Sequence, residues 1–124
     1  MSNGYNATLA GGQEIYIPSW PANVQFENLV QATKQLGQDH VINISALNVP
    51  AAMLAVMGSE DPKAVTSLVL HFVQQCRIDG EKVSQANFDT LGLPILIELF
   101  THVMHSQYHA FFESGLAKAA SPQS

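Results

Sequence analysis

The segment from Leu93 to Gly115 constrains the fold more than any other part of the chain, because it holds the longest apolar pattern in the sequence. At about 100° per residue, its apolar side chains cover more than half of a helix circumference. A surface helix on a small globular protein needs an apolar stripe of only about 100°. We therefore expect this helix either to lie centrally in the fold or to bury a second face against a partner.

Two further helices are predicted in the first half of the chain. From Pro21 to Leu36 the apolar residues follow helical spacing, and Gly37 supplies a stop signal. From Val49 to Met57 the residues are apolar all round, with Ser45 or Asn48 available as a cap. This second helix is either buried in the core or a docking surface, since methionine side chains adapt to varied partners.

The clearest amphipathic helix is predicted after Asp61, which can cap it, with Pro62 at its first position. Its apolar positions recur at helical spacing: Val65, Leu68, Val69, Phe72, Val73 and Cys76. The single cysteine lies on this apolar face, so we expect a buried thiol without an internal disulfide, as suits a reducing compartment.

The remaining segments are short. Residues 13–20 alternate apolar and polar side chains and predict a strand or extended arm. Residues 40–44 are rich in β-branched side chains and predict an extended linker. The Asp79-Gly80 dipeptide predicts a β-hairpin with strands of two or three residues. Residues 87–90 offer caps to a short turn before the final helix.

Together these patterns predict a mainly α fold, a small helical bundle of four to five helices with a short N-terminal strand or arm and a small β-hairpin near Asp79-Gly80. We expect one helical domain over residues 13–115. Residues 1–12 and 116–124 are polar or small and unpatterned, and predict flexible tails.

The composition excludes several classes of function. The chain is 47% apolar and 12% charged, against a usual charged fraction of about 25%. A net charge of −5 argues against nucleic-acid binding, which requires clustered basic residues. The apolar runs are too short and interrupted to span a membrane, and no signal peptide is evident. A surface with so few charges opposes self-association only weakly, so we expect a homo-oligomer.

Four polar side chains fall on one stripe of the final helix: Glu98, His102, His105 and His109. This spacing resembles that of metal ligands. However, the first and last members lie about 16 Å apart along a straight helix, so one ion could use at most two neighbours. We interpret the stripe as the solvated face of the helix, with a metal site or a pH-sensitive contact as alternatives.

No other group of residues predicts catalysis. Cys76 lies on an apolar face, where a thiol is unreactive. The sequence has no G-x-S-x-G elbow and no glycine-rich phosphate loop. The neighbouring carboxylates of Glu60 and Asp61 precede a predicted helix, and the helix dipole stabilises negative charge at that end, so no catalytic role is needed to explain them. We therefore expect neither an enzyme nor a cofactor.

Several aromatic residues are candidates for contact with another protein. Trp20 either packs the start of the first helix or serves as an exposed binding residue. The side chains of three aromatic residues leave the final helix in widely different directions around its axis, so they cannot all face one core: Tyr108, Phe111 and Phe112. At least one of them is therefore a candidate for an intermolecular contact.

Four stretches give the chain a resemblance to a known family: IYIPSWPANVQFENLVQATKQLG, NVPAAMLAVM, FVQQCRIDGEKVS and NFDTLGLPILIELFTHVMHSQYHAFFESG. Over about Ile15 to Gly115 the sequence resembles the tail assembly chaperones of tailed bacteriophages. Gln107, Tyr108, Phe111 and Phe112 are similar to an aromatic pattern in the family's last helix. The stretch 87–89 is similar to its element before that helix.

This resemblance implies a small, helical, non-enzymatic protein of the host cell cytoplasm. It implies binding of the tape measure protein and recruitment of tail-tube subunits. The predicted binding surface comprises Phe100, Met104, Tyr108, Phe111 and Phe112, together with Met53, Met57 and, as an exposed residue, Trp20. The alternatives are a structural subunit of the virion or tail, a metal protein built on the histidine stripe, and a regulator of a host protein.

Overall fold

The computed structural model describes residues 4–114, over which the chain forms six helices and one small antiparallel sheet. This confirms the mainly α fold class. The helices are α1 (Ala22–Leu36), α2 (Gln38–Ser45), α3 (Val49–Met57), α4 (Pro62–Val73), α5 (Gln85–Leu91) and α6 (Leu93–Glu113). The strands are β1 (Gly4–Thr8), β2 (Glu14–Pro18), β3 (Arg77–Ile78) and β4 (Glu81–Lys82).

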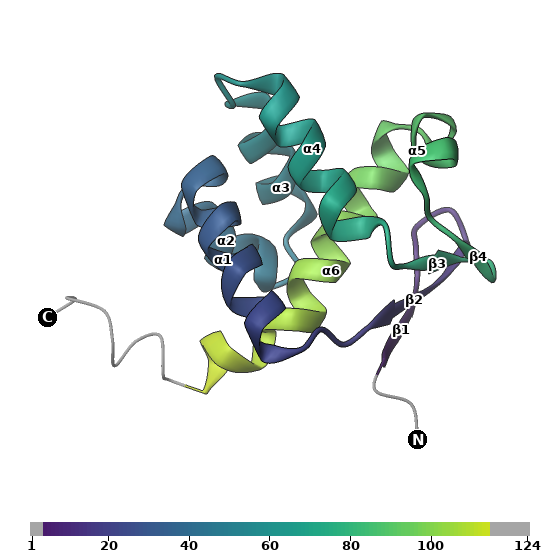
Figure 1. Ribbon diagram of the computed structural model, residues 1–124, viewed down its shortest axis with the longest axis horizontal. Coiled ribbons are helices and arrows are strands. Elements are labelled where there is room, and N and C mark those ends of the chain that lie inside the picture. Colours follow the sequence, from purple (N-terminus) through teal and green to yellow (C-terminus); the bar gives the residue numbers. More distant parts are fainter. Residues whose placement is uncertain (1–3, 115–124) are drawn as a thin grey trace, which may run out of the picture.

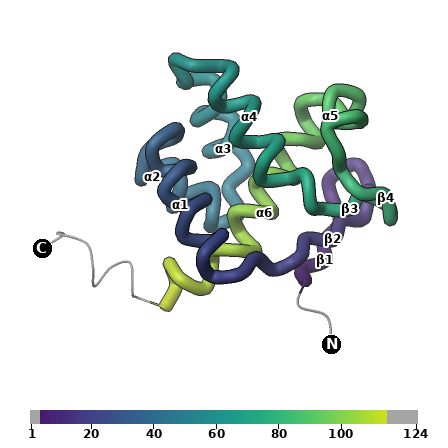
Figure 2. Tube along the Cα trace, in the orientation of Figure 1, coloured from purple at the N-terminus to yellow at the C-terminus, as the bar shows by residue number. Residues whose placement is uncertain are grey.

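Helix α6 occupies the centre of the fold, which is the first of the two alternatives that the width of its apolar arc left open. It contacts α2, α3, α4 and strand β2 (Figure 1). The four strands lie in the order β1-β2-β3-β4 to one side of the helices (Figure 2). The wide apolar surface of α6 is therefore covered largely by elements of the same chain.

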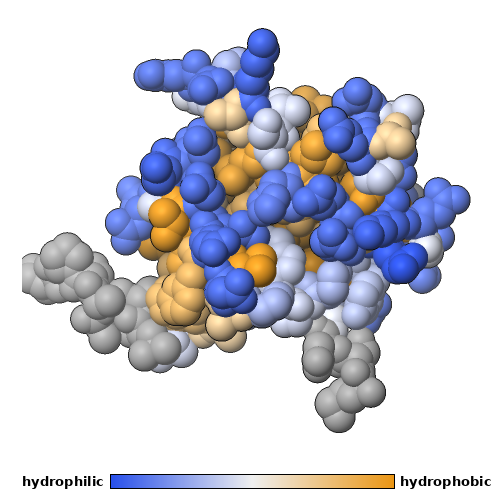
Figure 3. Space-filling model, viewed as in Figure 1, coloured by the Kyte–Doolittle hydropathy of each residue, from blue (hydrophilic) through white to orange (hydrophobic). Residues whose placement is uncertain are grey.

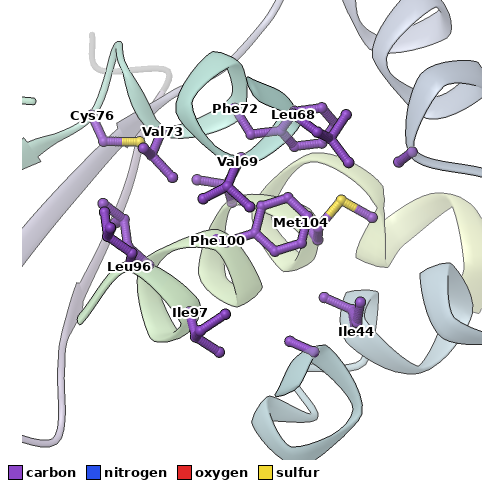
Figure 4. Packing of buried hydrophobic residues seen from close by; sticks show 14 of the residues in the cluster. Ile44, Leu68, Val69, Phe72, Val73, Cys76, Leu96, Ile97, Phe100 and Met104 are labelled. Atoms are coloured by element: carbon purple, nitrogen blue, oxygen red, sulfur yellow. The ribbon is translucent and has the colours of Figure 1, made fainter. Parts of the chain in front are cut away.

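The core forms where α4 and α6 face each other (Figure 4). The ring of Phe72 on α4 lies 5.3 Å from the ring of Phe100 on α6, measured between centroids. Ile44 reaches the same core from α2, and its side chain is fully buried. The predicted apolar face of α4 is buried along its whole length, including Cys76 just beyond the helix.

In two helices, α3 and α4, the first turn is capped by a side chain of the predicted type. The side chain of Asn48, not Ser45, accepts a hydrogen bond from the N–H of Ala51 at 3.0 Å and begins α3. Asp61 begins α4 by accepting a hydrogen bond from the N–H of Ala64 at 3.2 Å. The predicted hairpin is present, and both residues of its turn have positive φ (50° and 86°), as an Asp-Gly turn requires.

The prediction of an extended linker over residues 40–44 is wrong, because these residues belong to helix α2. Gly37 has a φ of 94°, which ends α1 and lets α2 begin at the next residue. Within α2, Val41 and Ile44 are three positions apart and both are buried. Packing of this apolar pair in the core therefore outweighs the preference of β-branched residues for extended structure.

Two other predictions are corrected. Residues 4–8 of the expected N-terminal tail form strand β1, which pairs with β2 from Gly4 opposite Pro18 to Thr8 opposite Glu14. The expected short turn near residues 87–90 is helix α5, which begins with a capping box between Ser84 and Asn87. The predicted tail over residues 116–124 lies outside the described residues.

Candidate protein-binding surface

Three of the predicted contact residues on α6 are core residues. Phe100, Met104 and Tyr108 are all buried, and the hydroxyl of Tyr108 donates a hydrogen bond to the carbonyl oxygen of Gln25 at 2.8 Å. Burial also raises the pKa of Tyr108. Because the surrounding elements enclose Phe100 and Met104 completely, these two side chains do not contribute to a surface, and their predicted place in a binding surface is corrected. Tyr108 keeps a small exposed edge, which lines a groove described below.

Trp20 packs against the core at the start of α1, which agrees with the first of its two interpretations, a packing role rather than an exposed binding residue. Its ring lies edge-on to the ring of Phe72, with centroids 5.2 Å apart, and 6.3 Å from the ring of Tyr108. Its backbone N–H donates a hydrogen bond to the side chain of Gln107 at 3.1 Å. The indole is half-buried, so its main contribution is to join α1, α4 and α6.

Helix α3 presents methionines on its outer side because its small residues face inward. Ala51, Ala52 and Ala55 are buried and allow α3 to approach its neighbours closely. Met53 and Met57 remain 48% and 76% exposed. The structure therefore places both predicted methionines at the surface of the molecule.

These methionines line a groove between α3 and the first turns of α6, which we term the α3–α6 groove. It has a volume of about 410 Å³ and a predominantly apolar lining: Val49, Met53, Val56, Met57, Leu93 and Ile97, with Pro94 and Ala10. Glu98 is the charged residue that lines it. Leu93 was not among the predicted contact residues, yet it is exposed although it begins an apolar helix.

A second groove, the α1–α6 groove, lies near the other end of α6. It has a volume of about 290 Å³ and is lined chiefly by Phe26, Leu29, Tyr108 and Phe111. Phe111 is 39% exposed, whereas the adjacent Phe112 is half-buried against the core. Figure 3 shows apolar surface gathered where the end of α6 meets the start of α1. The two grooves use parts of α6 that are about 20 Å apart along its axis.

The family model described as "Phage tail assembly chaperone protein, TAC" matches residues 11–118, which is most of the chain. The protein belongs to this phage tail assembly chaperone family. No curated protein and no solved structure matches the chain. Membership suggests a non-enzymatic role and implies protein partners in tail assembly. The resemblance seen in the sequence is thereby confirmed.

The polar stripe of the chaperone's α6 is not the solvated face that its spacing predicted. Glu98 accepts a hydrogen bond at 2.8 Å from a backbone N–H in the β1–β2 loop. Nδ1 of the buried His102 hydrogen-bonds with the hydroxyl of Tyr5 on β1 at 3.0 Å. Nδ1 of His105 donates to a carbonyl oxygen of α2 at 3.0 Å. Strand β1 and helix α2 therefore cover the stripe, leaving His109 to pair with Glu113 at its end.

The titrating groups inside the chaperone are shifted mainly by burial. Burial lowers the pKa of His102; the carboxylate of Glu98 opposes this shift and neighbouring His105 adds to it. Burial raises the pKa of Cys76 to about 12, and the predicted buried thiol is confirmed. The same thiol is a poor nucleophile, because almost no thiolate is present near neutral pH.

Residues 4–114 contain neither a candidate metal site nor a candidate membrane span. No three His, Cys, Asp or Glu side chains of that region gather in an arrangement that could hold a metal ion. Nor does that region contain a helix long and apolar enough to cross a membrane. The α3–α6 and α1–α6 grooves, whose linings are predominantly apolar, are the candidate sites for binding another protein.

Proposed function

We propose that the chaperone binds amphipathic helical segments of the phage tape measure protein in the α3–α6 groove. One observation carries this proposal: Met53, Met57 and Leu93 are exposed together around an apolar groove between two helices. An amphipathic helix binds such a groove through apolar side chains spaced at three and four positions. Methionine side chains suit a site that accepts many different segments, because they repack easily.

The size of the groove favours weak, repeated contacts. Burying about 600 Å² of apolar surface contributes roughly 15 kcal/mol, at about 25 cal/mol per Å². Association costs an estimated 4–15 kcal/mol and more, so the net affinity of one copy is modest. Several copies on one long partner gain by avidity. Such binding keeps the tape measure protein soluble and is reversible when the tail tube assembles around it.

The α1–α6 groove provides a second contact surface on the same molecule. A chaperone that holds a helix in one groove has the other free for a tail-tube subunit or a second chaperone. We assign recruitment of tail-tube subunits to this surface. The process takes place in the host cell cytoplasm and requires protein binding without catalysis or a cofactor.

The test is co-expression with the tape measure protein, scored by the fraction of that protein that stays soluble and co-purifies. Met57→Asp introduces a charge at a highly exposed groove position, so it should retain the fold and reduce co-purification strongly. Asn43→Asp adds the same charge to an exposed position of α2 outside the groove lining and should have no effect. Circular dichroism of both variants checks the fold.

Two results would contradict the proposal. One is that Met57→Asp and Asn43→Asp co-purify with the tape measure protein as well as the wild type does. The other is that the chain never associates with the tape measure protein but is found in finished particles. That second result would favour the structural-subunit alternative.

A further inference from the structure

The outer face of α1 is apolar at its centre and faces away from the bundle. Phe26 and Val30 are 72% and 56% exposed, and they lie four positions apart on one side of the helix. The opposite side buries Asn28, Ala32 and Leu36. Helix α1 packs on α2 and α4 through that inner side (Figure 1). Its outer face is exposed at Val30, and Phe26 at the edge of that face also lines the α1–α6 groove.

The same outer face carries both charged residues of α1. Glu27 and Lys34 are seven positions apart, both are exposed, and they flank the apolar pair on the same side of the helix. Neither side chain forms an ion pair within the described part of the chain, residues 4–114. One acidic and one basic residue are thus placed at opposite ends of an exposed apolar stripe.

This arrangement is self-complementary, and we infer that the outer face of α1 binds a second copy of the chain with the two α1 helices antiparallel. The midpoint between Glu27 and Lys34 lies between residues 30 and 31. A two-fold axis through that point places Glu27 of each copy opposite Lys34 of the other, forming the same pair twice. A parallel arrangement would instead place like charges together.

The two-fold contact also covers the exposed apolar side chains. Val30 of both copies meets at the axis, and the ring of Phe26 lies beside the aliphatic part of Lys34 from the other copy. The helix has 15 residues and is about 22 Å long. Its face is smaller than the roughly 800 Å² per partner of a standard interface. The dimer is therefore weak and forms as the protein concentration rises.

The experiment is sedimentation equilibrium of the full chain over a series of protein concentrations. The wild type should show a reversible monomer–dimer equilibrium. Glu27→Lys and Lys34→Glu each replace two opposite-charge pairs by two like-charge pairs, and should raise the dimer dissociation constant about tenfold or more. Glu81→Lys reverses a charge on exposed strand β4 and should leave the constant unchanged.

Mixing the two single variants gives the decisive result. One variant then carries two lysines and the other two glutamates on α1, so a heterodimer should form more tightly than either homodimer. The double variant Glu27→Lys/Lys34→Glu should dimerise like the wild type. A wild type that stays monomeric, charge reversals without effect, or a mixture without heterodimer would each overturn the inference. The test needs no phage partner, so it stands or falls independently of tape measure binding. Because Phe26 also lines the α1–α6 groove, the dimer and a tail-tube subunit in that groove compete for this side chain.

Discussion

Replacing Phe100 with alanine should destabilise the fold strongly, although the sequence pattern placed this residue on the binding surface. The side chain is fully buried, and its ring packs against that of Phe72 on α4. Truncation of a buried phenylalanine costs about 3–5 kcal/mol, from lost burial and the cavity left behind. Small domains are stable by about 5–15 kcal/mol, so this loss is a large fraction of the total.

Urea unfolding followed by circular dichroism measures this loss, with Met57→Ala as the matched control. Met57 is largely exposed, so its truncation should change the free energy of unfolding by no more than about 0.5 kcal/mol. For a chain of this size, Phe100→Ala should lower the thermal midpoint by about 12–20 °C. Wild-type stability combined with loss of partner binding in Phe100→Ala would refute its placement in the core.

Three further predictions concern stability and reactivity. Burial lowers the pKa of His102 in the folded chain, so as the pH falls the imidazole takes up its proton in the unfolded chain before it does so in the folded chain. The free energy of unfolding should therefore be highest above about pH 6.5 and should decrease as the pH falls below that value. A pH series of thermal midpoints should show this decrease, and His102→Gln should flatten it; equal slopes would contradict the assignment. Cys76 should react with a thiol reagent at the rate of unfolding, and rapid reaction of the native protein would contradict its burial. Asn48→Ala should cost about 1 kcal/mol in urea unfolding, because it removes the cap of α3; no loss would contradict the capping bond.

The elements predicted correctly from the sequence are those whose signals are local. Helices α1 and α4 have regular apolar spacing and stop or cap residues at their ends. The hairpin at residues 79–80 follows from its turn residues alone. By contrast, α2 was taken for a linker because Val41 and Ile44 favour extended structure when considered alone. Its helical state depends on burial in the core, which the sequence of the segment does not reveal.

The binding surface was harder to predict, because a helical wheel does not show which side another element covers. The arc of α6 that holds Phe100 and Met104 is apolar and was placed on the surface, yet the neighbouring helices enclose it. The histidine stripe is polar and was interpreted as solvated, yet Tyr5 of β1 packs over it. Strand β1 lies in a segment that was predicted to be a tail, so that cover was not foreseen.

The exposed face of α1 is a different case, because its signal was present in the sequence. Phe26 and Val30 lie on the opposite side of the helix from Ala32 and Leu36. One helix therefore carried apolar residues on two sides, and only one side could face the core. The apolar spacing of α1 was interpreted as a single stripe, which concealed the second face.

Photo-crosslinking from position 57 is the most direct test of the central claim that the α3–α6 groove binds the tape measure protein. A photoreactive amino acid replaces Met57 during co-expression, and mass spectrometry identifies the crosslinked peptides. Crosslinks should fall on the apolar positions of several helical segments of the tape measure protein, while the same amino acid at Asn43 gives few. Crosslinks from position 57 that reach only other proteins, or that match those from position 43, would contradict the claim.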